Sequence, residues 1–585
     1  MESSCGTDFR HELARVLSST TFAQAAKQRD LLKWLVEQTL SGQAEAFSQY
    51  AIATSALDYS ADFDPTSDSR VRTAVRRLRE RLTDYYQKEG RLNRFRISIG
   101  DGQYTPQLLQ ADLLPSLPAP GPALSSSASL AVLVLPFLPV GFYDDDCFCD
   151  GLTLNLMRAL AGSGQARVVP WTTAHWLADK TGDKREHYLK TNADVILEGL
   201  VQESSKKKWN ITVQWVDGPT GLFDHFYQVR GESAAVLSMV DELAGQITNA
   251  LRVTYDERVR ARLTLRHSND LAALTFYLRA RRDAMTFTPP RIRRAFELVA
   301  HAVGRDPYFA AAHALQAELH LAVGDSGTAQ ATPHAKLARE SSEQALVIAP
   351  ELGDALAARG AIELTYDWDL ARAEETLTSA CSDALADAAP HWPPILDLAR
   401  GKNEEAAQRF EAWARLDPGC GAKAGVAAEF WYYARRFDLA IRWGYTALEL
   451  DEQNVRAASI VAGSHMELGN KDESLRLARE YNTYAPELCE TNLLLATLLA
   501  QAKQHADARQ VLDRWNERKA NTYEPPILLA VAHAWLGDIS QALDAMRRVV
   551  DDRQTVCLFA RSAPYLAPLH AQPGFADMLN EAGAP

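Results

Sequence analysis

The sequence predicts a multidomain protein with an α+β unit first, an α/β layered domain next, and an all-α array of repeats last. Three observations support this prediction. An arginine-rich amphipathic helix and a hairpin pattern lie within the first 110 residues. Apolar strand-like runs alternate with helical patterns in residues 129–258, and small residues recur at a fixed period beyond residue 270. A chain of 585 residues has room for about three to five domains.

The first unit, residues 1–110, is predicted to begin with three helices and a turn. The helical patterns are Phe9–Ser18, Ala23–Leu40 and Tyr50–Leu57. A segment rich in Asp and Ser, with Pro65, has the composition of a turn. It leads into Ser69–Lys88, whose apolar residues recur at steps of three and four and predict a helix with one buried stripe.

The helix Ser69–Lys88 concentrates positive charge. It holds seven cations and two acids, whereas the whole chain carries a net charge of −13. Such a cluster on an acidic chain favours a polyanionic partner, and nucleic acid is the commonest. Residues 1–112 contain fifteen basic and fifteen acidic residues, so only the uneven distribution of charge favours DNA. A solvated, ion-paired helix face is the alternative interpretation.

Two strand patterns follow the basic helix. RFRISI (94–99) and QYTPQLL (103–109) flank the turn Gly100-Asp101-Gly102. Helices, a basic helix and a carboxy-terminal hairpin together predict a winged helix-turn-helix whose basic helix enters the major groove. Arg70, Arg72 and Arg76 are the candidates for base edges, and the other arginines for phosphate contacts or internal ion pairs. The full set of candidate DNA contacts is Arg70, Arg72, Thr73, Arg76, Arg77, Arg79, Arg81, Arg94 and Arg96.

This unit resembles a known family. FDPTSDSRVRTAVRRLRERLTDYYQKEG followed by RFRISIGDGQYTP is similar to the winged-helix domain of bacterial regulators that also contain helical repeats, and more distantly to OmpR-type effector domains. Asp101 departs from that family, which usually has a basic or apolar residue there. The resemblance implies a DNA-binding transcriptional regulator. Its matching residues are Val71, Arg77, Leu78, Arg79, Arg81, Leu82, Gly100, Gly102 and Tyr104.

A linker and an α/β domain are predicted next. Residues 111–128 hold four prolines and a serine run, which is typical of a linker. Strand patterns then alternate with helices, and this predicts an α/β layer. The domain resembles the TolB amino-terminal-like (FlgO-like) domain of the same regulators, and it has no phosphate-binding glycine loop. The strand patterns are 129–137, 166–171, 193–204, 208–221 and 223–231.

The carboxy-terminal half repeats every 34 residues. Gly401, Arg435, Gly469, Lys503 and Gly537 are spaced at this interval. Five residues after each stands a small residue: Ala406, Ala440, Ser474, Ala508 or Ala542. This period predicts about seven tetratricopeptide repeats in residues 270–550, stacked into a superhelix that binds a protein or peptide. An insertion is expected at 324–333, and residues 551–585 resemble the cap of such arrays.

The sequence predicts no catalytic centre, cofactor or metal site. It lacks the H-E-x-x-H, G-x-S-x-G and C-x-x-C patterns, and its seven cysteines are scattered. Some proteins with this layout carry a nucleotide cyclase domain, but the three predicted regions leave no segment for one. The longest apolar run is about twelve residues with two prolines, and the amino terminus lacks a signal-peptide pattern. We therefore expect a cytoplasmic protein without membrane contact.

Three functional hypotheses follow. The first is a cytoplasmic bacterial regulator that binds double-stranded DNA, while its α/β domain and repeats sense a partner or ligand. The second is a scaffold in which the winged helix is itself a protein-interaction module. The third is a ligand-gated sensor whose output lies in the repeat array. A homodimer fits the first hypothesis, because one winged helix reads few base pairs.

Overall fold

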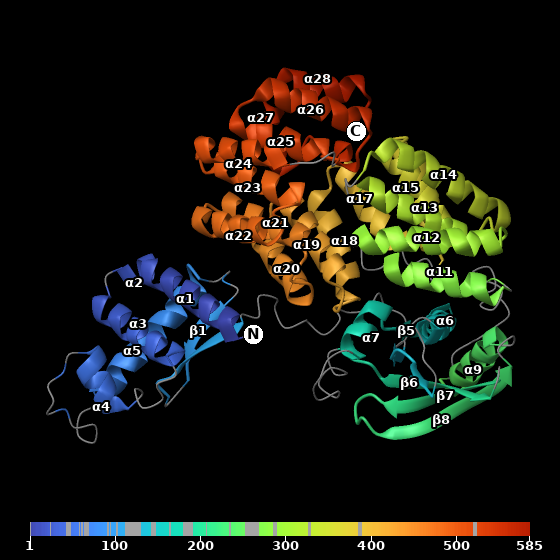
Figure 1. The fold of residues 1–585 in the computed structure, drawn as a ribbon, viewed down its shortest axis with the longest axis horizontal. Helices are drawn as coiled ribbons and strands as arrows, with labels where there is room; N and C mark the ends of the chain where they lie inside the picture. Colours follow the sequence, from blue (N-terminus) through green and yellow to red (C-terminus); the bar gives the residue numbers. More distant parts are fainter. Residues whose placement is uncertain are drawn as a thin grey trace. The chain divides into compact units, whose positions relative to one another are not determined.

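The protein folds into two compact units, Met1–Gly121 and Pro122–Pro585, and the boundary falls in the predicted linker (Figure 1). Arg94, Asp101 and the whole linker, residues 111–128, lie outside the described residues. The computed structural model describes residues 2–23, 25–41, 48–57, 59, 63, 70–90, 93, 95–100, 103–110, 130–141, 148–162, 165–178, 191–205, 208–232, 236–251, 268, 270–284, 289–325, 329–383, 389–518 and 523–585.

The amino-terminal unit contains helices and one antiparallel hairpin, as predicted. The segment expected as the helix Tyr50–Leu57 is instead the short α4 continuing into a π-helical turn, η2. In the hairpin, Phe95 lies opposite Gln110 and Ile99 opposite Pro106. The elements are α1 (Glu2–Ser18), α2 (Thr20–Ala23), α3 (Ala26–Leu40), α4 (Gln49–Ala51), η2 (Ile52–Ala56), α5 (Arg70–Gln87), β1 (Phe95–Ile99) and β2 (Pro106–Gln110).

The apolar stripe of α5 forms the centre of this unit. Val71, Val75 and Leu78 are at most 1% exposed, and they belong to one cluster with Leu35 of α3 and Ile97 of β1. Because burial of apolar side chains is the main favourable term in folding, this stripe decides which face of α5 points inward. The arginines of α5 are left on its other faces.

The middle of the chain forms the predicted α/β layer. Its six-stranded sheet has the order β5-β3-β6-β7-β8, and β4 also pairs with β6. β3 runs parallel to β5 and β6, whereas β6, β7 and β8 are antiparallel. The elements are β3 (Leu130–Val134), β4 (Leu138–Val140), α6 (Phe148–Gly162), β5 (Ala166–Val168), α7 (Trp171–Ala178), β6 (Val195–Ser205), β7 (Lys208–Asp217), β8 (Phe223–Glu232) and α9 (Val236–Ala250).

Helices cover the two faces of this sheet unequally. Strand residues such as Leu197 and Val213 share a core with α6 and α9 on one face. On the other face, Leu133 and Ile196 pack against α7. The strand predicted at 166–171 is shorter than expected, because Trp171 already begins α7.

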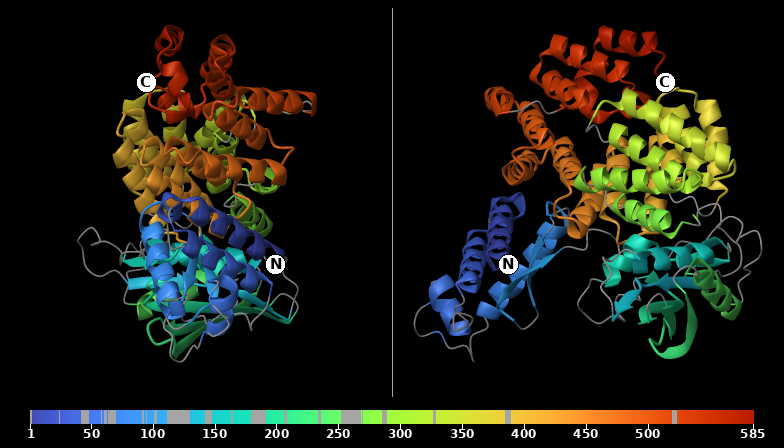
Figure 2. Two further views of the ribbon diagram at one scale, coloured as in Figure 1. Left: turned by 90° about the vertical axis from the view of Figure 1, so that its left-hand side faces the viewer. Right: turned by 45° about the vertical axis from the view of Figure 1, so that its right-hand side comes forward.

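From α11 to α26 the chain is an array of helices (Figure 2). Within the described residues, sixteen helices form eight consecutive pairs, against about seven predicted repeats. They are α11 (Leu271–Ala284), α12 (Pro289–Arg305), α13 (Ala310–Asp325), α14 (Ala331–Ile348), α15 (Gly353–Thr365), α16 (Leu370–Cys381), α17 (Trp392–Ala399), α18 (Asn403–Arg415), α19 (Gly421–Tyr433), α20 (Phe437–Leu450), α21 (Val455–Glu467), α22 (Lys471–Tyr484), α23 (Cys489–Gln501), α24 (His505–Arg518), α25 (Pro526–Leu536) and α26 (Ile539–Asp551).

Both halves of the predicted repeat pattern are confirmed. The five residues spaced 34 apart all adopt left-handed backbone, with φ between 57° and 82°, in the turns between helices. The five small residues that follow them are all 0% exposed. The insertion predicted at 324–333 lies partly within helices, since α13 extends to Asp325 and α14 begins at Ala331.

The carboxy-terminal segment caps the array and also contacts its earlier helices. Its elements η5 (Thr555–Leu558), η6 (Pro564–Leu566), α27 (Ala567–His570) and α28 (Pro573–Glu581) share a core with α25 and α26. The Asp552 carboxylate accepts hydrogen bonds from the backbone N–H groups of Ala331 and Thr332, both at 2.9 Å. Arg553 donates to the carbonyl of Tyr366. The last helix pair is thereby joined to the start of α14.

One buried carboxylate joins the α/β layer to the array. Asp417, in the turn between α18 and α19, is 2% exposed. It accepts hydrogen bonds from the hydroxyls of Thr172 and Thr173 in α7 at 2.5 and 2.7 Å, and Lys423 Nζ lies 2.8 Å away. The Thr173 hydroxyl accepts in turn from the N–H of Gly419 at 2.9 Å.

Candidate nucleic-acid interface

The outward face of α5 presents three exposed arginines, Arg72, Arg76 and Arg77. Within the part of the chain that the structure describes, neither Arg72 nor Arg77 makes a hydrogen bond or ion pair. Arg76 Nε lies 3.8 Å from the Glu80 carboxylate, and both side chains are about two-thirds exposed. An ion pair this exposed contributes under about 1 kcal/mol, so it leaves the Arg76 guanidinium available to a partner.

Arg70 and Thr73 occupy the first turns of the same helix. Arg70 is exposed, and its Cζ lies 4.4 Å from the centroid of the Tyr59 ring, a distance typical of a cation–π contact. Thr73 is half-buried. At the other end of α5, Lys88 Nζ lies 2.7 Å from the Asp84 carboxylate. The exposed arginines of α5 therefore lie in its first half.

Arg79 holds the hairpin against α5. Its Nε donates to the Ile99 carbonyl at 2.9 Å, and its Nη2 donates to the carbonyls of Gly100 and Gln103 at 2.6 and 2.7 Å. The side chain thus binds both sides of the turn between β1 and β2. Its guanidinium therefore holds the hairpin in position, whereas the sequence analysis proposed Arg79 for a phosphate contact or an internal ion pair.

Arg81 has a similar internal role. Its Nη1 donates to the Thr21 carbonyl at 2.8 Å, which ties α5 to α2. The Glu89 carboxylate accepts from the backbone N–H groups of Thr20 and Thr21 at 2.9 and 2.8 Å. Although partial burial acts to raise the pKa of Glu89, these hydrogen bonds lower it overall. Sequence reasoning did not single out Glu89, because its partners are almost 70 residues away.

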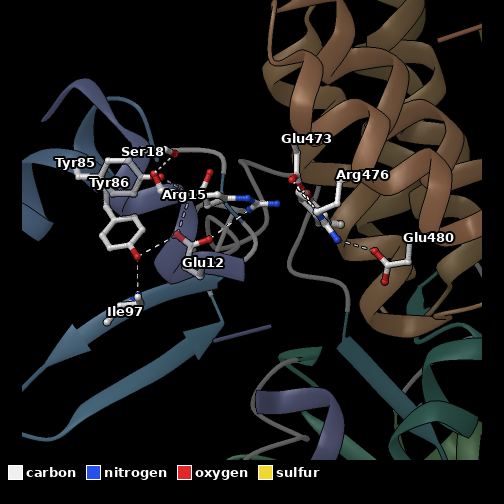
Figure 3. Close-up of polar contacts among 11 residues, drawn as sticks. Glu12, Arg15, Ser18, Tyr85, Tyr86, Ile97, Glu473, Arg476 and Glu480 are labelled. Carbon is white, nitrogen blue, oxygen red and sulfur yellow. Dashed lines mark hydrogen bonds and ion pairs between the residues drawn. The ribbon is translucent and has the colours of Figure 1, made fainter. Parts of the chain in front are cut away.

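A buried carboxylate fixes the other end of the hairpin (Figure 3). Glu12 of α1 is 1% exposed and accepts hydrogen bonds from Tyr86 at 3.1 Å and from Asn93 at 2.8 Å. The Tyr86 hydroxyl accepts from the N–H of Ile97 in β1 at 2.7 Å. Burial raises the pKa of Glu12, against the opposing effect of Arg15. No motif in the sequence pointed to this network.

Arg96 lies on the hairpin, while Arg94 falls outside the described residues. Arg96 is half-buried, and its Cζ lies 5.8 Å from the centroid of the Tyr86 ring. The structure thus sorts the predicted contacts into two groups. Arg72, Arg76 and Arg77 face solvent, and Arg70 is exposed beside the Tyr59 ring, whereas Arg79, Arg81 and Arg96 are half-buried against other parts of the unit.

The array offers a second candidate surface. A polar cavity of about 200 Å³ lies between α14, α15 and α16. Glu363 at its base is 2% exposed and is approached by the Nε atoms of Arg359 and Arg372 at 3.4 and 2.9 Å. The cavity is lined by Arg339, Ser342, Glu343, Arg359, Ile362, Glu363 and Arg372, a set suited to charged groups.

The aromatic cluster at the end of α19 belongs to the interior. Tyr432 and Tyr433 are buried. The Tyr433 ring centroid lies 4.7 Å from that of Phe559, and the Tyr432 ring stacks on Tyr565 at 6.5 Å. The capping segment thus covers these rings, and they are not exposed to a partner.

The described residues contain neither a metal-binding cluster nor a membrane-spanning helix. In these ranges no three His, Cys, Asp or Glu side chains converge in a way that could hold a metal ion. Among the same residues, no helix combines the length and apolar character needed to cross a bilayer.

Parts of the chain are similar to known proteins. No family model matches it. It is 27% identical over 197 residues to a putative adenylate cyclase 3 of Rhizobium meliloti (strain 1021), and the match spans 33% of each protein. Among solved structures, Pseudomonas aeruginosa pilF shares 19% identity and covers 38% of this chain and 96% of its own, with a TM-score of 0.27. A tetratricopeptide repeat protein from Parabacteroides merdae shares 15% identity over 53% of this chain and 98% of its own, with a TM-score of 0.25.

Proposed function

We propose that the protein is a protein-interaction scaffold whose tetratricopeptide-type array binds a protein or peptide partner. The regular array supports this proposal: left-handed turns at 34-residue intervals, each followed by a fully buried small residue, stack its helix pairs. Stacked pairs of this kind provide an extended surface on a rigid frame. The cavity at Glu363 adds a polar site for charged side chains of the partner.

Affinity capture from the producing cells tests the scaffold. A partner is expected to copurify in fixed proportion with the full chain and with a chain that lacks Met1–Gly121, which is a compact unit of its own. It is expected to be lost from a chain that lacks the array. Retention of the partner without the array would contradict the proposal.

A second function is favoured by α5: the amino-terminal unit is a winged helix that binds duplex DNA, which would make the protein a cytoplasmic transcriptional regulator. The supporting observation is the division among its arginines. Arg79 holds the hairpin to α5, while Arg72, Arg76 and Arg77 extend into solvent from the same helix. A positioned hairpin beside an exposed basic helix is the arrangement that fits one helix into a major groove. The middle domain, which resembles the TolB amino-terminal-like domain, would then sense a ligand or partner.

Recovery of DNA bound to the intact protein across the genome tests this second function. Enriched palindromic or tandem sites are expected, since regulators of this kind bind paired half-sites. The control is a variant in which Arg72, Arg76 and Arg77 are all replaced by Ala. If the wild type recovers no more DNA than this variant, the DNA-binding function is contradicted and only the scaffold function remains.

The proposal assigns no catalytic step to this chain. The sequence contains none of the catalytic motifs searched for, and the cyclase name belongs to a relative matched over one third of its length. Incubation of the full chain with ATP and Mg²⁺ is expected to form no cyclic AMP. Formation of cyclic AMP by the purified protein would overturn this assignment.

A further inference from the structure

β8 is the outermost strand of the six-stranded sheet (Figure 1). Among the described residues it pairs with β7 alone, so one side of its ten-residue backbone has no strand partner. Such an edge offers N–H and C=O groups to another strand. Proline and lysine, which commonly protect edges, are both missing from its sequence FDHFYQVRGE.

The strand also exposes apolar side chains beside this edge. Phe226 is 65% exposed and Phe223 is 55% exposed. Phe226 lies opposite Gln214 of β7, on the face away from the core that α6 and α9 share with the sheet. Leu200 and Leu138, paired with each other on β6 and β4, add further exposed apolar surface to the sheet. Two large exposed apolar side chains, Phe223 and Phe226, thus lie beside a strand edge that has no strand partner among the described residues, and exposed apolar surface is a feature of interaction sites.

The regular part of β8 is self-complementary. The register with β7 shifts near Phe223, and from His225 onward the pairing is continuous. If two β8 strands pair antiparallel with Gln228 at the centre, residues 225–231 of each copy, all within this regular part, lie opposite one another. This pairing places Phe226 of one copy opposite Arg230 of the other, twice by symmetry. The Arg230 guanidinium donates to Gln228 at 3.0 Å and has no carboxylate partner among the described residues, so it can lie over the exposed ring.

We propose that two copies of the chain associate through their β8 edges, antiparallel and centred on Gln228, to form one continuous sheet. On the inner face, Tyr227 of one copy would lie opposite Val229 of the other and extend the core. Asp224 lies at the register shift and has no paired residue on β7, whereas Glu232 pairs with Lys208 at the far end of β8. The pairing does not depend on DNA binding, although a dimer would carry two amino-terminal units.

Sedimentation velocity of the full chain over a range of concentrations tests this proposal. The wild type is expected to form a dimer. Phe226→Arg places an arginine opposite Arg230 of the other copy at both ends of the pairing. It is expected to raise the dissociation constant of the dimer at least about tenfold. Adding Arg230→Phe to that variant restores a Phe–Arg pair at each end and is expected to restore the dimer.

Leu138→Arg is the matched control, because Leu138 is 60% exposed on β4 and is absent from the proposed interface. It is expected to leave the dimer unchanged. A monomeric wild type would overturn the proposal. So would a dimer that Phe226→Arg leaves intact, a double variant that stays weakened, or a Leu138→Arg variant weakened to the same extent.

Discussion

The arginines of α5 differ in what they contact, and this separates stability from binding. Arg79→Ala removes three hydrogen bonds to the hairpin, so we expect the amino-terminal unit to lose about 1–3 kcal/mol of stability. Arg77→Ala removes an exposed side chain and is expected to change stability by less than about 0.5 kcal/mol. Hydrogen exchange of the β1 and β2 amides in the full chain measures both effects. Equal destabilisation by the two variants would contradict this assignment.

A pair of histidines makes the stability of the array depend on pH. The Nδ1 atoms of His320 and His334 lie 3.0 Å apart. Burial, with a smaller contribution from His334, lowers the pKa of His320 from 6.5 to about 4, and burial also lowers that of His334. The unfolded chain therefore takes up protons near pH 6.5 while the folded array does not, so stability should fall as pH drops from about 6.5 towards 4.

Thermal unfolding between pH 7.5 and 4.5 measures this dependence. His334→Gln removes one titrating group and the contact to His320, so its melting temperature should fall less steeply with pH. His505→Gln, in an exposed position at the start of α24, serves as the control and should follow the wild type. Identical pH profiles for His334→Gln and the wild type would contradict the explanation.

At the scale of single elements, the turns between paired helices give a test of backbone strain. Lys503 holds φ at 66°, a conformation that costs a residue with a side chain about 1–2 kcal/mol. Lys503→Gly is therefore expected to stabilise the array by about 0.5–1 kcal/mol after the entropic cost of glycine. Gly469 has a φ of 82° and open space around an added Cβ. Gly469→Ala should therefore lower the stability of the array by about 1 kcal/mol. Chemical unfolding measures both, and effects of the opposite sign would refute the turn geometry.

Periodic elements were predictable and irregular ones were not. The α5 stripe and the 34-residue repeat were recognised because their spacing repeats with the geometry of the helix and of the paired-helix unit. The π-helical turn η2 and the start of α7 at Trp171 were missed. Trp171 lies at the end of a short apolar stretch, where spacing cannot distinguish a strand from a helix. For η2 the helical pattern was recognised, but not the wider turn.

At the scale of the whole molecule, the roles of individual side chains depend on residues far away in sequence. Arg79 and Arg81 were indistinguishable from Arg72 and Arg77 by composition, and only the folded hairpin and α2 separate them. Asp417 lies in a turn between two helices of the array, yet its partners in α7 lie about 245 residues away. Local spacing therefore predicted the domains and the basic helix, but could not predict which charges remain available to a partner.

Asp417 provides a test of how the α/β layer is joined to the array. Asp417→Ala leaves two threonine hydroxyls and Lys423 without their buried acceptor, so we expect a loss of about 1–3 kcal/mol. Asp451 stands at the equivalent position one repeat later and is exposed, so Asp451→Ala should have a much smaller effect. The Gly419 amide donates to the Thr173 hydroxyl, so its hydrogen-exchange rate reports on the contact between α7 and the array. No difference between the two variants would contradict a special role for Asp417.

The salt dependence of binding to duplex DNA tests the central claim about α5 most directly. Affinity of the full chain should fall steeply with salt, and the triple variant Arg72→Ala/Arg76→Ala/Arg77→Ala should reduce the log–log slope by about 2–3, since each lost phosphate contact removes about 0.9. Arg10→Ala/Arg29→Ala, which removes exposed arginines of α1 and α3, should change the slope less. A wild type that does not bind DNA at low salt, or a triple variant with an unchanged slope, would contradict the claim.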